Sequence, residues 1–149
     1  MVVIDDGEIG LRLIRNNKRG HISSGFVPIE YYMIIRLRDG ITVGQCDLRV
    51  GNNEAINYAG HIGYSVMPPY QGHHYAAKAC KLLMVLAKAR GLEEILITCN
   101  PDNMASRRTC EIIGAYFLGI VQVPSYAVDY SLGNYEKCQY RVLCKREPL

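Results

Sequence analysis

The sequence predicts a mixed α/β domain, of the α+β type. It would hold a mostly antiparallel sheet of about six or seven strands with a central parallel pair and flanking helices. Two observations carry this prediction. Strand-like runs joined by short turns fill the first half of the chain, and a strand–helix–strand unit spans residues 61–100. Such a unit places its two strands parallel with a right-handed crossover. We expect one domain to cover residues 1–149.

The first half of the chain indicates a succession of strands. Glu8–Arg15 mixes apolar and charged residues and is the first candidate strand. Val27–Arg38 is rich in β-branched and tyrosine residues, which favours a strand. Asp39-Gly40 is a strong hairpin signal, so Ile41–Val50 is the expected return strand. His61–Met67 is another strand, and the two prolines that follow it prevent the ladder from continuing.

The second half of the chain changes in character at Tyr75. Apolar residues recur at a helical period over Tyr75–Arg90, which predicts an amphipathic helix, and Gly91 is its expected end. Ile95–Cys99 is a short apolar run typical of a strand buried on both faces. Asn103–Ile113 is the second predicted helix. Two further strands are expected at Tyr116–Val123 and Cys138–Lys145.

Composition and charge exclude several classes of protein. Apolar residues make up 49% of the chain and charged residues 21%, as in an ordinary soluble domain, and the net charge of +3 is too small to predict nucleic-acid binding. The longest apolar run has six residues, far short of the roughly 18 that cross a membrane. The first residues do not resemble a signal peptide, so we expect a cytoplasmic protein that binds neither membrane nor nucleic acid.

The six cysteines indicate neither a disulfide scaffold nor a metal site. None forms a Cys-x-x-Cys pair, and each lies among apolar neighbours. We therefore interpret them as reduced packing residues. His73 and His74 are adjacent, and adjacent residues rarely ligate one ion together, so no metal is expected.

The most informative segment is the junction between the strand at His61–Met67 and the helix at Tyr75–Arg90. Consecutive unpaired N–H groups at a helix start point outward, and the helix dipole adds partial positive charge there. Together they suit a phosphate or pyrophosphate. A plain strand-to-helix turn is the alternative that this feature alone leaves open.

Two motifs in this order resemble those of the GNAT N-acetyltransferase superfamily, a family of acyl-CoA N-acyltransferase fold. The family pattern Gln/Arg-x-x-Gly-x-Gly/Ala after an apolar strand is matched at Gln71–Ala76, which is Gln-Gly-His-His-Tyr-Ala. The second motif is an Asn that opens a helix ending in Gly, here Asn103 to Gly114. The Gly-His-Ile-Gly-Tyr segment at 60–64 is typical of a bacterial group of predicted acetyltransferases. The resemblance covers at least residues 27–145.

The resemblance implies acetyl-CoA as the acetyl donor and a cleft where the two parallel strands splay apart. The strand at Tyr64–Val66 would bond the pantetheine arm through its main chain. The following loop would hold the pyrophosphate, and Asn103 would touch the arm from the other side. The implied cofactor-binding residues are Tyr64, Ser65, Val66, Gln71, Gly72, His73, His74, Tyr75, Ala76, Ala77 and Asn103.

The chain departs from the family pattern at two positions. His74 replaces the central glycine of the first motif, where glycine permits unusual dihedral angles and a close approach of phosphate. Weaker CoA binding, lost binding and a new hydrogen bond to phosphate are all open outcomes. Cys110 stands where many members carry a tyrosine that protonates the CoA thiolate. A thiol can donate a proton, and packing is the alternative role.

His61 is the leading candidate for the general base. An attacking ammonium must first lose its proton, and an imidazole with a pKa near neutrality suits that task. Some relatives carry a glutamate at or near this place on the strand before the first motif. A histidine hydrogen-bonded within the strand is the alternative. Asp47 and Glu54 are weaker candidates.

These features predict transfer of an acetyl group from acetyl-CoA to an amine by direct attack in a ternary complex. The acceptor, a small molecule or a peptide, is not indicated, because residues 1–30 and 124–137 carry no recognisable pattern. A homodimer that completes the acceptor wall stays open. A degenerate module that binds or senses acyl-CoA is the competing class. A domain that binds another nucleotide ranks last.

Overall fold

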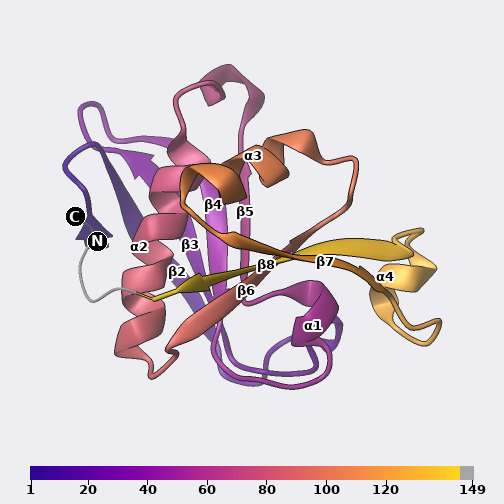
Figure 1. Cartoon of the computed structure of the whole chain (residues 1–149). Helices are drawn as coiled ribbons and strands as arrows, with labels where there is room; N and C mark the ends of the chain where they lie inside the picture. Colours follow the sequence, from indigo (N-terminus) through magenta and orange to yellow (C-terminus); the bar gives the residue numbers. More distant parts are fainter. Residues whose placement is uncertain (145–149) are drawn as a thin grey trace.

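The computed structural model describes residues 1–144, which form eight strands in two antiparallel sheets (Figure 1). The larger sheet has the order β1-β2-β3-β4-β5 and the smaller one β6-β8-β7. The strands of the larger sheet are β1 (Val2–Asp5), β2 (Ile9–Asn17), β3 (Ile29–Arg36), β4 (Ile41–Arg49) and β5 (Ile62–Val66). Those of the smaller sheet are β6 (Glu94–Cys99), β7 (Tyr116–Gln122) and β8 (Glu136–Leu143).

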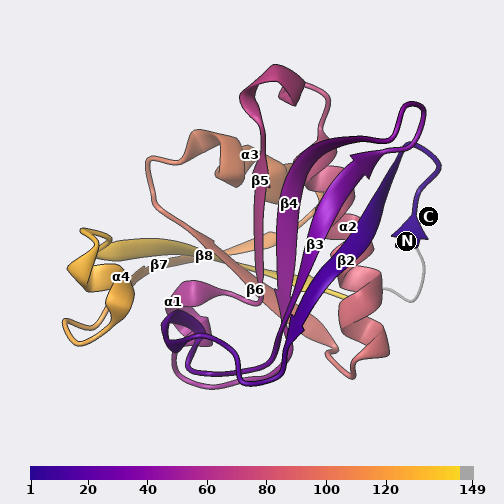
Figure 2. The ribbon, with the colours of Figure 1, turned by 180° about the vertical axis from the view of Figure 1, so that it is seen from behind.

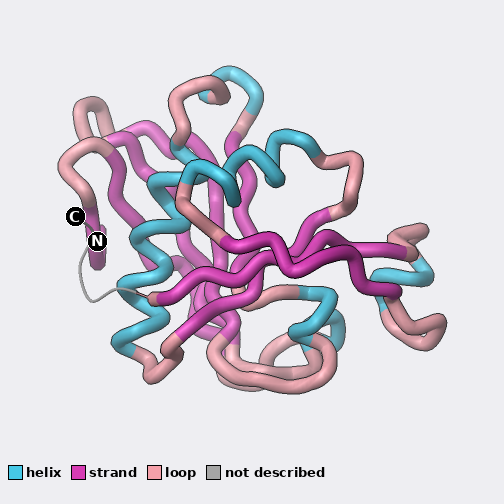
Figure 3. The backbone as a smooth tube through the Cα atoms, viewed as in Figure 1, coloured by secondary structure: helices cyan, strands magenta, loops and turns pink. Residues whose placement is uncertain are grey.

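Two longer helices and several short turns connect these strands. Helix α2 (Tyr75–Ala89) joins β5 to β6 and lies across the larger sheet, which is seen in front of it in Figure 2. Helix α3 (Met104–Ile112) joins β6 to β7. Figure 3 shows how the helices and loops surround the two groups of strands. The short elements are α1 (Ile56–Ala59), α4 (Val128–Ser131) and the 3-10 turns at Ile22–Ser24 and Pro68–Tyr70.

The core lies between α2 and the larger sheet and continues onto the smaller one. Leu11 on β2 is the cross-strand partner of Ile34 on β3, and both are fully buried. Leu82 and Leu83 of α2 are fully buried in the same cluster. Burial of each of these side chains contributes about 1.5–3 kcal/mol. The apolar residues that recur at a helical period in the sequence therefore form the face by which α2 packs against the sheet.

The structure confirms the mixed α/β class and revises its sheet. The described residues form eight strands rather than six or seven, because Val2–Asp5 pairs with β2. The predicted parallel pair, β5 and β6, does not form a ladder. In the described chain the N–H of His61 donates to the carbonyl of Leu96 (2.7 Å), and beyond this point the two strands belong to separate sheets.

Two smaller predictions are confirmed. All six cysteines are free, and five of them are buried. Gly91 follows α2 with φ +92°, a conformation that favours glycine at a helix end. None of the helices within residues 1–144 is long and apolar enough to cross a membrane.

Candidate functional site

A cavity of about 690 Å³ opens where β5 and β6 diverge. Its walls come from β5, the loop leading to α2, the first turns of α3 and the end of β6. Arg49, Ala59 and Asp129 line it as well, so the cavity reaches the short helices α1 and α4. Nine of the residues predicted to bind the cofactor line it: Tyr64, Ser65, Val66, Gln71, Gly72, His74, Tyr75, Ala76 and Asn103.

The start of α2 supplies a row of free hydrogen-bond donors. In the described chain the backbone N–H groups of residues 72–77 donate to no protein atom. Gln71 holds the entry to this loop, because its side-chain amide donates to the carbonyl of Val66 (2.9 Å). Free N–H groups at the positive end of a 15-residue helix form a ready anion site.

His74 takes the conformation that the family pattern reserves for glycine. Its φ of +60° and ψ of +27° lie in the left-handed region, and its side chain does not cap the helix. Side chains other than glycine enter this region at a cost, although histidine is among those found there more often. The backbone at His74 therefore has a conformation that glycine would adopt without this cost.

His73 and Ala77 do not line the cavity. Ala77 is buried beneath the first turn of α2, and the ring of His73 packs beside Tyr75 with centroids 5.3 Å apart. The backbone N–H groups of both residues donate to no protein atom among the described residues.

On the opposite wall, Asn103 and Ser106 begin α3. The side-chain oxygen of Asn103 accepts a hydrogen bond from the backbone N–H of Ser106 (3.1 Å), so Asn103 caps this helix. The hydroxyl of Ser106 hydrogen-bonds that of Tyr64 on β5, with 2.6 Å between the oxygens. This contact brings a pair of hydroxyl groups into the cavity where the strands diverge.

Cys110 lies in the core rather than at the cavity surface. Its side chain is fully buried and is not among the residues that line the cavity. Burial raises the pKa of its thiol to about 12. The phenol of Tyr64 lies beside it, so a hydroxyl group is present in this region although the family's tyrosine is missing from position 110.

His61, the predicted base, lies directly before β5 and is held by its own hydrogen bonds. It is 2% exposed and does not line the cavity. Its Nδ1 accepts the backbone N–H of Leu96 (2.8 Å), which places the ring proton on Nε2. Nε2 lies 2.9 Å from the side-chain oxygen of Asn52 and 3.1 Å from the carbonyl of Gly51. Burial lowers the pKa of this histidine. The two ring nitrogens therefore connect β6, through Leu96, to the loop at Gly51 and Asn52 that follows β4.

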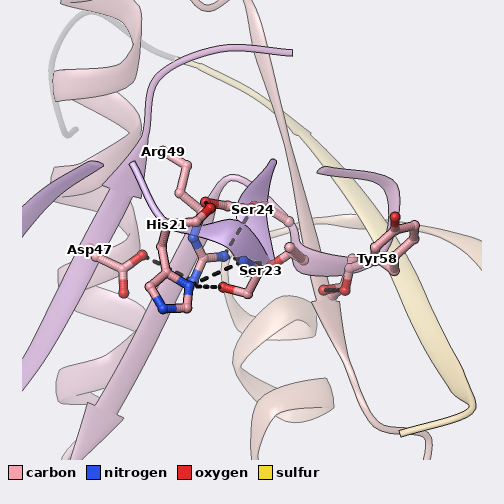
Figure 4. A network of polar contacts seen from close by, with 9 residues as sticks. His21, Ser23, Ser24, Asp47, Arg49 and Tyr58 are labelled. Atoms are coloured by element: carbon pink, nitrogen blue, oxygen red, sulfur yellow. Dashed lines mark hydrogen bonds and ion pairs between the residues drawn. The ribbon is translucent and has the colours of Figure 1, made fainter. Parts of the chain in front are cut away.

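Arg49 lines the cavity, and Asp47 lies next to it on β4 (Figure 4). Arg49 Nη1 donates to the carbonyls of Ala59 (2.6 Å) and Gly60 (3.1 Å). Its Nη2 is 3.2 Å from Asp47 Oδ1, an ion pair whose geometry does not make a hydrogen bond. Burial raises the pKa of Asp47, against the opposing effects of Arg49 and the N–H of Gly63.

Gly63 lies between the Asp47 carboxylate and the cavity lining. It is the cross-strand partner of Asp47 and lines the cavity, whereas Asp47 does not. A Cβ atom on Gly63 would lie 2.9 Å from Asp47 Oδ2. The glycine therefore leaves room for a half-buried carboxylate one residue away from the cavity lining.

The motif analysis missed Ser106 and Arg108, which also line the cavity from α3. Arg108 is largely exposed, with a loose contact of 3.9 Å to Glu111. Their distance from Asn103 in the sequence could have indicated this. Residues three to five positions after a helix cap lie in the first turns of the helix, near the cap. The pairing of Ser106 with Tyr64 depends on how two distant elements meet.

A model of the family described as "Acetyltransferase (GNAT) domain" matches residues 6–115. No curated protein matches the chain. Among solved structures, the chain is similar to the ribosomal L7/L12 alpha-N-protein acetyltransferase RimL in complex with coenzyme A. The identity is 16%, with 99% of this chain and 100% of RimL covered and a TM-score of 0.69.

Two further structures resemble the chain. One is the microcin C7 self-immunity acetyltransferase MccE in complex with acetyl-CoA and AMP, at 20% identity and a TM-score of 0.57, covering 77% of this chain and 61% of MccE. The other is a GNAT acetyltransferase from Bacillus anthracis, at 23% identity and a TM-score of 0.58, covering 76% and 65%. The matches thus span less than two thirds of these two proteins. The family match covers most of the chain, and the protein belongs to the GNAT acetyltransferase family.

Proposed function

We propose that the protein is an N-acetyltransferase that moves the acetyl group of acetyl-CoA to an amine within a ternary complex. One observation carries this proposal above the others. The row of free N–H groups at residues 72–77 borders a cavity that runs between the two sheets. An anion site at one end and an open path at the other suit a long donor with charged phosphates and a reactive thioester.

The donor would lie along the cavity with its pyrophosphate on the N–H groups of residues 72–77. The pantetheine arm would follow β5, and Arg108 would attract the phosphates from α3. The structures of RimL with coenzyme A and of MccE with acetyl-CoA support this choice of donor. His73 and Ala77 would then bind through their backbone only.

In the proposed reaction the amine nitrogen attacks the thioester carbonyl carbon, the carbon–sulfur bond breaks, and the thiolate leaves. Asp47 is the proposed base, because its carboxylate packs against Gly63 of the cavity lining and burial raises its pKa, which suits removal of a proton from the ammonium. The Tyr64–Ser106 hydroxyl pair is the proposed proton source for the thiolate, in place of Cys110. Burial raises the pKa of Tyr64, so the phenol keeps its proton at neutral pH.

Two substitutions test these roles separately. Asp47→Asn should remove the acidic limb of the rate profile and lower kcat by about 10² or more, because the base is lost. Tyr64→Phe should lower kcat by about 10–10² while the Kd for CoA stays within about twofold. A mutant of either residue with unchanged kcat and pH profile would remove that residue from the mechanism.

The main test is acetyl transfer itself. The protein, acetyl-CoA and a panel of small amines and short peptides should release free thiol only when an acceptor is present. One observation favours a second candidate, a module that binds acyl-CoA without turnover. His74 and Cys110 replace two residues of the family pattern. Binding of acetyl-CoA by calorimetry, with no thiol release from any amine, would select the binding module.

A further inference from the structure

A second cavity of about 350 Å³ lies beside the first, on the side of α1 and α4. Ser23 lines both cavities. Tyr58 connects them as well, because it lines the second cavity and its carbonyl accepts a hydrogen bond from the hydroxyl of Thr98, a residue of the first (2.8 Å). Figure 4 shows Ser23 and Tyr58 in the same region as Arg49. An acceptor whose amine lies in the first cavity can therefore extend into the second.

The second cavity has apolar walls and one charged group. Ile22, Ala55 and Val128 contribute apolar surface. Within residues 1–144, Glu54 is the only charged side chain that lines it. The hydroxyl of Tyr126 donates to the carboxylate of Glu54, which fixes this group at the cavity. At about 350 Å³ the space is at the lower end of ligand pockets.

Two carboxylates lie near Tyr58, at the place where the two cavities meet. Burial raises the pKa of Tyr58, and the carboxylates of Glu54 and Asp129 raise it further. Asp129 lines the first cavity, so a carboxylate borders each of the two spaces. Apolar walls with a carboxylate at the edge complement an alkyl chain that ends in a cation.

We infer that the acceptor carries a second cationic group, which the second cavity binds next to Glu54 while the reacting amine lies in the first. This inference rests on the proposed function and names its substrate class. A diamine has this chemistry, and so does a peptide whose second residue is lysine. Glu54 is then a specificity-determining residue rather than a base.

Matched pairs of acceptors test the inference. 1,4-Diaminobutane is compared with butylamine, and the tripeptide Ala-Lys-Ala with Ala-Gln-Ala, by kcat/KM for thiol release from acetyl-CoA. The wild type should favour the cationic member of at least one pair by about three- to tenfold, as for a partly exposed ion pair. A preference within the first pair indicates a small polyamine as the acceptor, and a preference within the second pair indicates a peptide.

Glu54→Gln should abolish this preference and leave the rate with the neutral acceptor within about twofold. Glu93→Gln is the matched control, because Glu93 is an exposed glutamate paired with Lys88 outside both cavities, and it should keep the preference. Equal rates for both members of both pairs in the wild type, or a preference that survives Glu54→Gln, would overturn the inference.

A binding measurement separates this failure from failure of the proposed function. Calorimetry with CoA present should show that 1,4-diaminobutane or Ala-Lys-Ala binds the wild type more tightly than Glu54→Gln, whether or not transfer occurs. Acetyl-CoA that binds without any turnover contradicts the proposed function alone. If neither cationic probe binds the wild type more tightly than the variant, the second cavity is not a cation subsite.

Discussion

At the start of α2, His74 has a backbone conformation that is unfavourable for a residue with a side chain. Its φ of +60° suits glycine, and a histidine in this conformation lowers the stability of the folded state. The sequence located this motif and left open whether His74 weakens, abolishes or assists CoA binding. In the structure His74 has a left-handed backbone, and the neighbouring N–H groups stay free.

His74→Gly should raise the free energy of unfolding by about 0.5–1 kcal/mol, because relief of the left-handed conformation exceeds the entropy that glycine adds to the unfolded chain. His73→Gly is the control. His73 does not have a positive φ, so this variant should lose stability instead. Denaturant titration of both variants measures the difference. Equal losses in the two variants would show that His74 carries no backbone strain.

His61 shows what local sequence leaves out at the residue scale. A histidine near the motif suggested a base, and the structure adds partners for both ring nitrogens: Leu96, Asn52 and Gly51, which local sequence does not place near it. Its pKa is lowered by burial, so the unfolded chain binds a proton more readily than the folded one. The stability that it contributes is present above about pH 6.5 and is lost as the pH falls toward the folded-state pKa.

His61→Gln should therefore weaken the dependence of stability on pH between about 7.5 and 5.5. The variant should also lose about 1–3 kcal/mol at pH 7.5, because buried hydrogen bonds are broken. His73→Gln should keep the acid sensitivity of the wild type. Unfolding titrations at the two pH values test this. A variant with wild-type stability and a lost acidic limb of activity would restore His61 as the base.

At the scale of elements, the periodicity of the sequence predicted most of the fold. The hairpin at Asp39-Gly40 and the helix that ends before Gly91 have strong local signals, and both are present. Val2–Asp5 was missed because a short edge strand alternates only between intermediate and exposed positions. The divergence of β5 from β6 was implied by the family resemblance alone. No local sequence pattern predicts that the facing edges of β5 and β6 stay unpaired.

The start of α2 makes a prediction about the ligand. CoA should raise the melting temperature, because a ligand that binds only the native state stabilises it by about 2.7 kcal/mol at 100 times its Kd. Pantetheine lacks the pyrophosphate and should give a much smaller shift at the same concentration. Thermal unfolding with each compound tests this element directly. Equal shifts would mean that the N–H groups of residues 72–77 do not hold the phosphates.

At the scale of the whole molecule, the site forms between parts that are distant in the chain. The first cavity joins β5, α3 and the end of β6, and the second joins the turn at Ile22–Ser24 to α1 and α4. Most residues of the wall that we propose for the donor could be predicted to lie together, because they belong to two continuous motifs. The acceptor side could not, because Ser23, Glu54 and Tyr126 meet only through the tertiary fold.

The initial rate of thiol release, with both acetyl-CoA and an amine varied, tests transfer in a ternary complex directly. Release should depend on the amine, and the double-reciprocal lines should intersect, as expected when both substrates are bound before the transfer. Calorimetric binding of acetyl-CoA with no amine-dependent release across the panel would contradict it. The cavity between the sheets would then hold an acyl-CoA without transferring its acetyl group.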